Sequence, residues 1–394
     1  MKITDIRLVT LLGEERPAVI GDAQPQLNPI HIYARDRELR RYPSLRAPAS
    51  GRHEAIYLML RTDSGLEGCY GPIDELPATI IHRSLRGFLI GEDPLAGELQ
   101  WDRLQRSDRH ARSGHYMMAI SIVDNALWDL RGRHFGVPVY RLLGGPTRPH
   151  VEAYATMLAI SHETDALTAE ARRVRDLGFD AQKYFFAHGP GDGRAGMAQN
   201  VRLARDLRAA VGPDVDLMFD AFSGWDRDYA RRWIDEVASD VRPAWLEEPF
   251  MPEQTAAYEA LRGATSVRIA AGEHLFGRWE ADRYLRNQRV DVLQCDPEWC
   301  GGISEFVRIA TVASLYGIPL IPHGHTFYAA LHAVAALPPE VAPRMEYILN
   351  LQPLRHHFDR NFPQPDRNRF ALPVLPGFGI EIDESRVISG SVWE

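Results

Sequence analysis

Residues 215–221, 244–249 and 268–274 read VDLMFDA, AWLEEP and RIAAGEH, and these three stretches decide the fold. Each is a short apolar run that leads into an acidic residue, which is typical of a buried parallel strand with a polar residue at its carboxyl end. Amphipathic helical segments separate the three stretches, among them Tyr229–Ala238. Strands that alternate with helices in this way predict an α/β fold built on a parallel sheet.

The same alternation continues from Arg148 to about residue 350. Helices are expected at Ala166–Leu177, Ala198–Val211 and Ser304–Tyr316, and glycines close several of them. Eight strands separated by seven helices predict a (β/α)₇β barrel of the TIM type rather than an open sheet. The strands are expected at VEAYAT (151–156), AQKYFF (181–186), VDLMFDA, AWLEEP, RIAAGEH, VLQCDP (292–297), PLIPHG (319–324) and RMEYIL (344–349).

The first part of the chain has a different pattern. Strands are expected at Lys2–Leu12 and Ala55–Thr62, and a polar stretch rich in arginine and proline, Gln24–Arg52, is a candidate lid. Apolar residues at three- and four-residue spacing predict a helix over Gly114–Phe135. The final segment is expected to carry a strand at GIEIDE (379–384). We predict an N-terminal α+β capping domain (1–125), a barrel (126–375) and a C-terminal segment that returns to the capping domain (376–394).

Composition narrows the function. The 394 residues are 45% hydrophobic and 25% charged, which is typical of a globular protein and excludes a mainly disordered one. The net charge of −8 offers no basic field for nucleic acid, so a small-molecule partner is expected. No apolar run is long enough for a membrane span, and the N-terminus reads as a strand rather than a secretory signal, so the predicted location is the cytoplasm. Three cysteines do not suffice for a closed cysteine metal site.

Three acidic residues stand at the ends of successive predicted strands: Asp220, Glu247 and Glu273. Any one of them could be a helix cap or a surface charge. The carboxyl ends of barrel strands converge on one mouth, however, and three carboxylates placed together repel one another unless a cation joins them. An all-oxygen set favours Mg²⁺, so we predict that these three residues bind Mg²⁺. The neighbouring Glu248 is expected on the opposite side of its strand, in a supporting role.

The next strands supply candidate acid–base groups. Asp296 and His323 end the sixth and seventh strands, and an aspartate beside a histidine fixes its tautomer and raises its basicity. A satisfied structural histidine is the alternative for His323. Lys183, at the end of the second strand, and Glu346, on the eighth, are expected at the same mouth. His325 completes an HGH sequence that also occurs at hydrolase metal sites, and its role is left open.

Taken together, these residues resemble the enolase superfamily, in its mandelate racemase-like subgroup. The resemblance covers nearly the whole chain and rests on several strings: DNALWDLRGRHFGVPVYRLLGG (124–145), FDA, WLEEP, AGEH, DPEWCGG, PHG and PGFGIE. It implies a capping domain on a (β/α)₇β barrel and one Mg²⁺ on the acids that match Asp220, Glu247 and Glu273. It also implies removal of a proton next to a carboxylate, and enolase-type sites use a Lys or His base with Mg²⁺.

The resemblance also bears on the reaction. Racemases of the subgroup use a second base, the second lysine of a K-x-K motif, and here Lys183 matches the first lysine while Phe185 stands at the second. A dehydratase needs only one histidine, which takes the α-proton and then protonates the leaving hydroxyl. We therefore expect His323 to act with Asp296, Lys183 to face the substrate carboxylate, and Glu346 to bind substrate or support the leaving group.

The closest resemblance is to acid-sugar dehydratases of the L-rhamnonate type, which convert a sugar acid to its 2-keto-3-deoxy product. The lid and the residues after PHG match that group poorly, which leaves the sugar open. Arg46 and His31 in the lid, together with His325, are the candidates for contacts with the distal hydroxyls; the alternative for the two lid residues is plain surface.

Three rival functions remain at the level of sequence. The first is an acid-sugar epimerase or racemase of the same family, and the second is a family member that binds a sugar acid without turnover. The third is a zinc hydrolase, which only the HGH sequence suggests. By analogy with the family, the chain is expected to form a homo-oligomer, either a dimer or an octamer.

Overall fold

A computed structural model describes residues 1–15, 26–39, 51–158, 160–325 and 327–394. The N-terminal part contains an antiparallel sheet in the order β12-β1-β2-β3. Its strands are β1 (Ile3–Glu15), β2 (Arg52–Thr62), β3 (Glu67–Ile73) and β12 (Ser389–Val392).

The last strand of this sheet comes from the end of the chain. β12 pairs antiparallel with β1, so that Val9 faces Val392. The strand expected at 379–384 is wrong: this stretch forms only an isolated bridge between Ile382 and Asp359 and a short 3₁₀ turn, Glu384–Arg386. Two glycines with positive φ, Gly377 and Gly379, interrupt extended backbone at the start of this stretch. Pairing with β1 begins only at Ser389.

The chain up to residue 142 also contains helices and turns. The longest, α5 (Gly114–Phe135), has the bounds predicted from its periodicity and contacts β3. The others are a 3₁₀ turn (Pro29–Ile32), α1 (Ala34–Leu39), α2 (Glu75–Ile80), a π-helical turn (Ile81–Leu85), α3 (Arg86–Leu89), α4 (Gly97–Arg106) and α6 (Val139–Leu142).

A curled parallel sheet forms the second part, in the order β10-β4-β5-β6-β7-β8-β9. Its strands are β4 (His150–Met157), β5 (Ala181–Phe185), β6 (Asp216–Asp220), β7 (Trp245–Glu247), β8 (Ile269–Ala271), β9 (Val292–Leu293) and β10 (Met345–Ile348). The last strand, β10, pairs with the first, β4. A short antiparallel strand, β11 (Arg369–Ala371), pairs with the other edge of β4.

The seventh predicted strand, 319–324, is reduced to one parallel bridge between Leu293 and Leu320. Proline at positions 319 and 322 explains this, because proline cannot donate the ladder hydrogen bonds of a central strand. The predicted (β/α)₇β barrel with a cap is otherwise confirmed, as a parallel sheet curled on itself beside the antiparallel N-terminal sheet.

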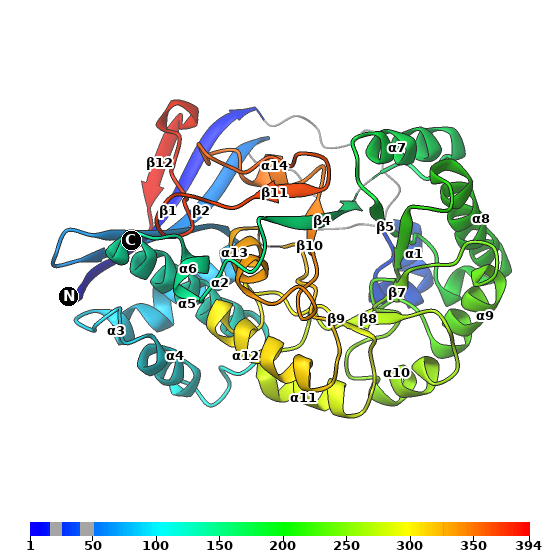
Figure 1. The fold of residues 1–394 in the computed structure, drawn as a ribbon, viewed down its shortest axis with the longest axis horizontal. Helices are drawn as coiled ribbons and strands as arrows, with labels where there is room; N and C mark the ends of the chain where they lie inside the picture. The colour runs from blue at the N-terminus through cyan, green and yellow to red at the C-terminus, as the bar shows by residue number, and fades with distance from the viewer. Residues whose placement is uncertain (16–25, 40–50, 159, 326) are drawn as a thin grey trace.

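The outer helices lie between the strands in sequence and surround them in space (Figure 1). They are α7 (Thr164–Asp176), α8 (Gly193–Val211), α9 (Arg227–Val237), α10 (Thr255–Arg262), α11 (Gly277–Arg286), α12 (Gly302–Leu315) and α13 (Tyr328–Ala336), and the short α14 (Gln352–Arg355) follows β10. Among the helices of the described chain, none is both long and apolar enough to cross a bilayer.

Helix α5 joins the capping sheet to the barrel. The Asp124 carboxylate accepts hydrogen bonds from the Ser304 backbone NH (3.0 Å) and hydroxyl (2.7 Å) at the start of α12. Asp129 accepts from the backbone NH groups of Cys69 (2.8 Å) and Phe378 (2.7 Å). The motif 124–145 thus holds the capping sheet and the barrel together. The domain boundary predicted at residue 125 lies inside α5.

The barrel interior is filled by one apolar layer. Each of the strands β4 to β9 contributes one residue, and so does the segment 319–324, which we call the bridge segment. This is expected when alternate side chains of a strand point inward. They are Tyr154, Ala181, Met218, Trp245, Ala270, Val292 and Ile321. This layer forms the floor beneath the mouth of the barrel.

Candidate active site

The polar layer directly above this floor follows from the period of two in a strand. Two residues beyond Tyr154, Ala181, Met218 and Trp245, toward the carboxyl ends, stand four buried polar residues. They are Thr156, Lys183, Asp220 and Glu247. Asp220 on β6 is the direct neighbour of Glu247 on β7 in the sheet register. The same alternation that fills the core with apolar side chains therefore brings these polar groups together.

Lys183 lies among three carboxylates. Its Nζ contacts Glu247 Oε1, lies 2.8 Å from Glu346 Oε1 and lies 3.5 Å from Asp220 Oδ2. Burial would lower the pKa of this lysine, but the charges of Glu247 and Glu346 raise it well above its ordinary value. Lys183 is therefore an ammonium ion held by charge.

Asp220 and Glu247 are held by further contacts. The backbone NH of Phe222 donates to Asp220 Oδ1 at 2.8 Å, and the indole NH of Trp245 donates to Glu247 Oε2 at 2.8 Å. Burial, and then the charge of Glu247, raise the pKa of Asp220 well above its ordinary value. The raised pKa of Asp220 thus reflects the cost of placing a second negative charge beside Glu247 in a buried site.

Glu273 follows β8 and lies beside a second acid–histidine pair. Its Oε1 is 3.7 Å from Nδ1 of His274, and Nδ1 of His274 is 3.1 Å from Glu248 Oε2. Burial and the charge of Glu248 raise the pKa of Glu273, to about 7, against the opposing charges of His323 and His274. Among the described residues, the set of three whose ligand atoms all lie within 4.8 Å of one another is Glu248, Glu273 and His274.

The position of Glu248 differs from the sequence expectation. β7 ends at Glu247, and Glu248 has a φ of +34°, so the alternation of the strand is broken at this residue. Its carboxylate turns toward Ser223, whose hydroxyl donates at 3.1 Å, and toward His274. It therefore lies next to Glu273 instead of pointing away from the predicted ligands.

Asp296 and His323 form the pair that the sequence suggests. Nδ1 of His323 lies 2.9 Å from Asp296 Oδ2, and its Nε2 lies 3.6 Å from Glu273 Oε2. Asp296 is in turn fixed by the backbone NH of Glu298, which donates to Oδ1 at 2.6 Å. Burial lowers the pKa of His323, but Glu273 and the bond to Asp296 raise it to about 9. The aspartate leaves Nε2 as the ring nitrogen available on the cavity side.

These groups border one cavity of about 520 Å³ at the carboxyl ends of the strands. Its polar wall includes Lys183, Asp220, Glu273, His323 and Glu346. Glu247 lies beneath this wall and is fully buried. Another part of the cavity wall is apolar. It is formed by the cluster of Leu158, Phe185, Phe222, Ile348 and Leu351.

Glu346 has a clear structural role. Its Oε1 accepts a hydrogen bond from Thr156 at 2.5 Å and contacts Lys183, while its Oε2 accepts from the backbone NH of Gly324 at 2.8 Å. Gly324 follows His323 directly. Glu346 therefore links the ammonium of Lys183 to the loop that carries His323.

Of the three residues predicted to contact the distal hydroxyls, one lines the cavity in the described structure. His325 lines the cavity. His31 is buried and its Nδ1 accepts from the backbone NH of Asn28 at 3.1 Å, but it is not among the described residues that line the cavity. Arg46 lies outside the described residues. The segment near His31 does reach the barrel, because Leu27 donates its backbone NH to the Phe186 carbonyl at 2.8 Å and α1 lies beside the barrel (Figure 1).

Several residues of the cavity wall were not singled out from the sequence. Trp299 lies between three histidine rings, with its ring centroid 4.6 Å from that of His323, 5.1 Å from His325 and 5.7 Å from His274. His274 and Trp299 stand in the strings AGEH and DPEW. Their closeness in sequence to Glu273 and Asp296 could have identified them as site residues. Asp74 of the capping domain and Arg355 after β10 also line the cavity. No motif marks either of them.

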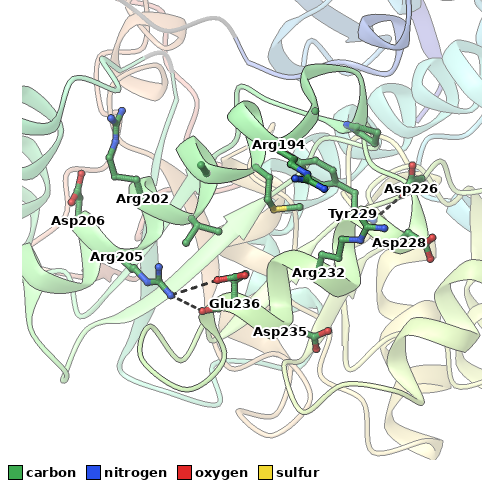
Figure 2. A pocket seen from close by; sticks show the side chains of 15 residues that line it. Arg194, Arg202, Arg205, Asp206, Asp226, Asp228, Tyr229, Arg232, Asp235 and Glu236 are labelled. Atoms are coloured by element: carbon green, nitrogen blue, oxygen red, sulfur yellow. Dashed lines mark hydrogen bonds and ion pairs between the residues drawn. The ribbon is translucent and has the colours of Figure 1, made fainter.

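A larger hollow of about 1030 Å³ lies elsewhere, between α8 and α9 on the outside of the barrel (Figure 2). Of its charged side chains, Arg205 lies 3.9 Å from Glu236 and also pairs, at 2.7 Å, with Asp240, which lies outside the hollow. Arg205, Asp240 and Glu236 each keep about half of their side-chain surface exposed, so these pairs are screened by water. The smaller cavity, with its buried carboxylates and acid–histidine pairs, is the better candidate for chemistry.

The donor set at the smaller cavity fits a hard divalent cation. Asp220, Glu247 and Glu346 are buried carboxylates around the ammonium of Lys183, and the buried Glu273 borders the same cavity. Oxygen ligands with an excess of negative charge suit Mg²⁺ better than zinc. The HGH sequence does not supply a rival zinc site within the described residues, because both ring nitrogens of His325 face carboxylates, those of Asp74 and Glu298.

Comparison with known proteins agrees with this architecture. The model of the mandelate racemase/muconate lactonizing enzyme N-terminal domain matches residues 31–144, and that of the enolase C-terminal domain-like family matches residues 166–386. An L-rhamnonate dehydratase from Saccharopolyspora erythraea is 32% identical over 78% of this chain and 77% of its own. A D-galactarolactone cycloisomerase from Agrobacterium fabrum is 33% identical over 84% of this chain and 90% of its own.

A solved structure gives the same result. Rhamnonate dehydratase from Gibberella zeae, complexed with Mg, has a TM-score of 0.84 and 25% identity, and the match covers 98% of this chain and 96% of that one. Both domains of the family are thus matched in sequence, and the whole fold is matched in space. The chain belongs to the enolase superfamily, in the branch of mandelate racemase and muconate lactonizing enzyme, as its motifs predict.

Proposed function

We propose that this protein is a Mg²⁺-dependent acid-sugar dehydratase, a hydro-lyase that removes the proton next to the substrate carboxylate and expels the 3-hydroxyl as water. The product is a 2-keto-3-deoxy sugar acid, and an aldonate of the L-rhamnonate type is the favoured substrate. The observation that carries the proposal is the Asp296–His323 pair, with a ring nitrogen toward a cavity lined by Lys183 and buried carboxylates. The dehydratase names of relatives support it.

In this proposal Asp220, Glu247 and Glu273 hold the Mg²⁺ ion. When bound, the ion supplies positive charge against the negative charge that develops on the substrate carboxylate during proton removal. A second assignment, Glu248 with Glu273 and His274, has the closest approach of ligand atoms. The all-carboxylate set is preferred because Asp220 and Glu247 are direct neighbours in the sheet register and all three members offer the oxygen ligands that Mg²⁺ prefers.

The protein groups have separate tasks in the reaction. Asp296 holds the His323 ring by Nδ1, so that Nε2 takes the proton from the carbon next to the carboxylate. The same nitrogen then returns this proton to the leaving hydroxyl, which departs as water. Lys183, kept charged by Glu346 and Glu247, attracts the substrate carboxylate and orients it. Glu346 positions this lysine.

The apolar side of the cavity bears on the rival racemase. Phe185, at the place where the subgroup's racemases carry a second lysine, is a buried member of the apolar cluster and cannot exchange a proton. A racemase must deliver a proton to the face opposite the one from which it was taken. Dehydration on one face by His323 has no such requirement.

The test is a screen of purified protein with Mg²⁺ against monocarboxylic and dicarboxylic sugar acids and their lactones. The lactones are included because one relative is named a cycloisomerase. We expect 2-keto-3-deoxy product and, in D₂O, one deuteron at C3 of that product. Recovered substrate with deuterium at C2 and its 3-hydroxyl intact would show an epimerase or racemase. Tight binding with no product from any compound would show a binding protein, and zinc in metal analysis a hydrolase.

The expected homo-oligomer, a dimer or an octamer, stays a prediction. Light scattering coupled to gel filtration would measure its mass directly.

A further inference from the structure

One wall of the cavity is built from both domains. The loop after β3 brings Asp74 of the capping domain to the barrel mouth, where its Oδ2 lies 3.0 Å from Nε2 of His325 and its Oδ1 lies 3.2 Å from Nη1 of Arg355. All three residues line the cavity that contains Lys183 and His323. The capping domain thus contributes a charged group directly to the candidate active site.

Asp74 is committed to this contact. It stands at the N-cap position of α2, yet its side chain makes no capping hydrogen bond and turns to the barrel instead. Burial would raise the pKa of Asp74, but the charges of His325 and Arg355 hold it well below the ordinary value. About half of the side-chain surface, 51%, remains exposed, so the carboxylate is accessible from the cavity.

Both cations of this wall are already neutralised. Arg355 also donates to the Pro72 carbonyl at 3.0 Å, and its Nη2 lies 3.8 Å from Glu298 Oε1. The other nitrogen of His325, Nδ1, lies 3.6 Å from the same Glu298 oxygen. Burial and Arg355 lower the pKa of His325, but Asp74 and Glu298 raise it to about 10. Two positive groups, Arg355 and His325, therefore face two negative groups, Asp74 and Glu298.

The neighbouring groups also suit an uncharged partner. Gln352 donates its amide NH₂ to the Gly324 carbonyl at 2.6 Å, which turns its Oε1 away from that carbonyl. Oε1 is buried and, within the described residues, has no hydrogen-bond partner, so Gln352 adds an uncharged polar group to this wall. Next to it, Leu351 and Ile348 belong to the apolar cluster of the cavity.

We propose that Asp74 makes the site selective for monocarboxylic sugar acids, because it neutralises Arg355 and His325 and thereby excludes a second carboxylate from this wall. The proposal rests on the proposed function, since it assumes that the first carboxylate binds near Lys183 and the metal ligands. A substrate with a hydroxyl or methyl at its far end meets an uncharged amide side chain, that of Gln352, and an apolar surface. A dicarboxylic acid meets the charge of Asp74, and repulsion of the wrong partner is an established source of specificity.

The test uses matched pairs of ligands that differ only at the far carbon: D-gluconate with D-glucarate, and D-galactonate with D-galactarate. Their affinities for the Mg²⁺-loaded protein are measured by calorimetry or by competition, so that turnover is not required. We expect each monoacid to bind at least about tenfold more tightly than its diacid, as one unit of opposing charge at close range implies. In Asp74→Asn this ratio should fall by about tenfold or more, since the cation of Arg355 is released.

Two further variants check the charge logic. Arg355→Gln removes the cation while Asp74 remains, and should raise the preference for monoacids instead of lowering it. Glu98→Gln is the matched control, because Glu98 also belongs to the capping domain and pairs with a barrel arginine, Arg308, but is 80% exposed and lies outside the cavity. It should leave the ratio unchanged. Thermal unfolding of each variant verifies that it is folded.

The proposal is overturned if a diacid binds to the unaltered protein as well as its monoacid, or if neither Asp74→Asn nor Arg355→Gln changes the ratio in the stated direction. It is also overturned if no monoacid of the two pairs binds. The two outcomes that concern the binding ratio are separate from a failure of the proposed function, which is read from the absence of 2-keto-3-deoxy product.

Discussion

Nδ1 of His323 lies 2.9 Å from Oδ2 of Asp296, and this contact decides which ring nitrogen faces the cavity. The aspartate comes from the loop after β9 and the histidine from the bridge segment that follows it in the barrel, so the pair forms only when the sheet has curled. If the proposed reaction is correct, this nitrogen transfers the proton.

His323→Asn should therefore reduce kcat by about 10²- to 10⁴-fold, the usual contribution of a positioned acid–base group. The amide keeps the size and polarity of the ring but cannot take the proton, so affinities for Mg²⁺ and substrate should stay within about threefold. Steady-state kinetics and calorimetry measure the two effects. The matched control is His356→Asn, because His356 forms a similar buried pair with Asp359, at 2.6 Å, outside the cavity. An unchanged kcat in His323→Asn would remove this residue from the mechanism.

The two possible ligand sets predict different effects on metal binding. Glu247→Gln should weaken Mg²⁺ binding by at least about tenfold, and Glu248→Gln by less, because the second residue is proposed only to support the ligands. Calorimetric titration with Mg²⁺ measures both. Treatment with EDTA should lower the melting temperature, since an ion that binds only the folded state stabilises it. The reverse order of the two variants would move the ion to Glu248, Glu273 and His274.

Gly132 on α5 is a position where a side chain cannot fit. A Cβ added there would lie 2.5 Å from the Gly377 Cα and 2.8 Å from the Val137 carbonyl oxygen, which are backbone atoms that cannot move aside easily. Gly132→Ala should therefore lower the free energy of unfolding by about 1–3 kcal/mol, the usual cost of overpacking. Urea unfolding measures it. Gly87→Ala, in α3 with open space around it, should instead be neutral or slightly stabilising.

His332 on α13 should make stability depend on pH. The ring is fully buried, its Nδ1 accepts from the backbone NH of Tyr140 at 3.2 Å, and burial lowers its pKa to about 3. Because the unfolded state then binds the proton first, the stabilisation is complete above about pH 6.5 and is lost as the pH falls toward 3. When the pH falls from 8 to 5, the free energy of unfolding should decrease by about 2 kcal/mol because of this residue.

The measurement for His332 is urea unfolding at both pH values for the unaltered protein and for His332→Gln. The variant should lose less stability on acidification than the unaltered protein does. His115→Gln, at an exposed position, serves as the control. Equal losses in the unaltered protein and in His332→Gln would show that the buried ring does not carry the effect.

The sequence predicts most of the fold because its periodicities are strong. The bounds of α5 follow from apolar spacing and a closing glycine, and the strands β6 and β7 follow from apolar runs that end in polar residues. The errors occur where local chemistry opposes the pattern. Proline reduces the strand expected at 319–324 to one bridge, and the last strand is displaced from 379–384 to Ser389–Val392.

The sequence by itself determined which residues could do chemistry at the mouth of the barrel. Asp220 and Glu247 stand at strand ends, and the period of two places Lys183, within β5, in the same layer. The tertiary structure alone decided how they are partnered. Asp74 and Arg355 are 281 residues apart, and Glu248 reaches His274 only through a turn of positive φ. Pairing across the two domains depends on how their surfaces dock. A local pattern along the chain does not show which residues meet when they do.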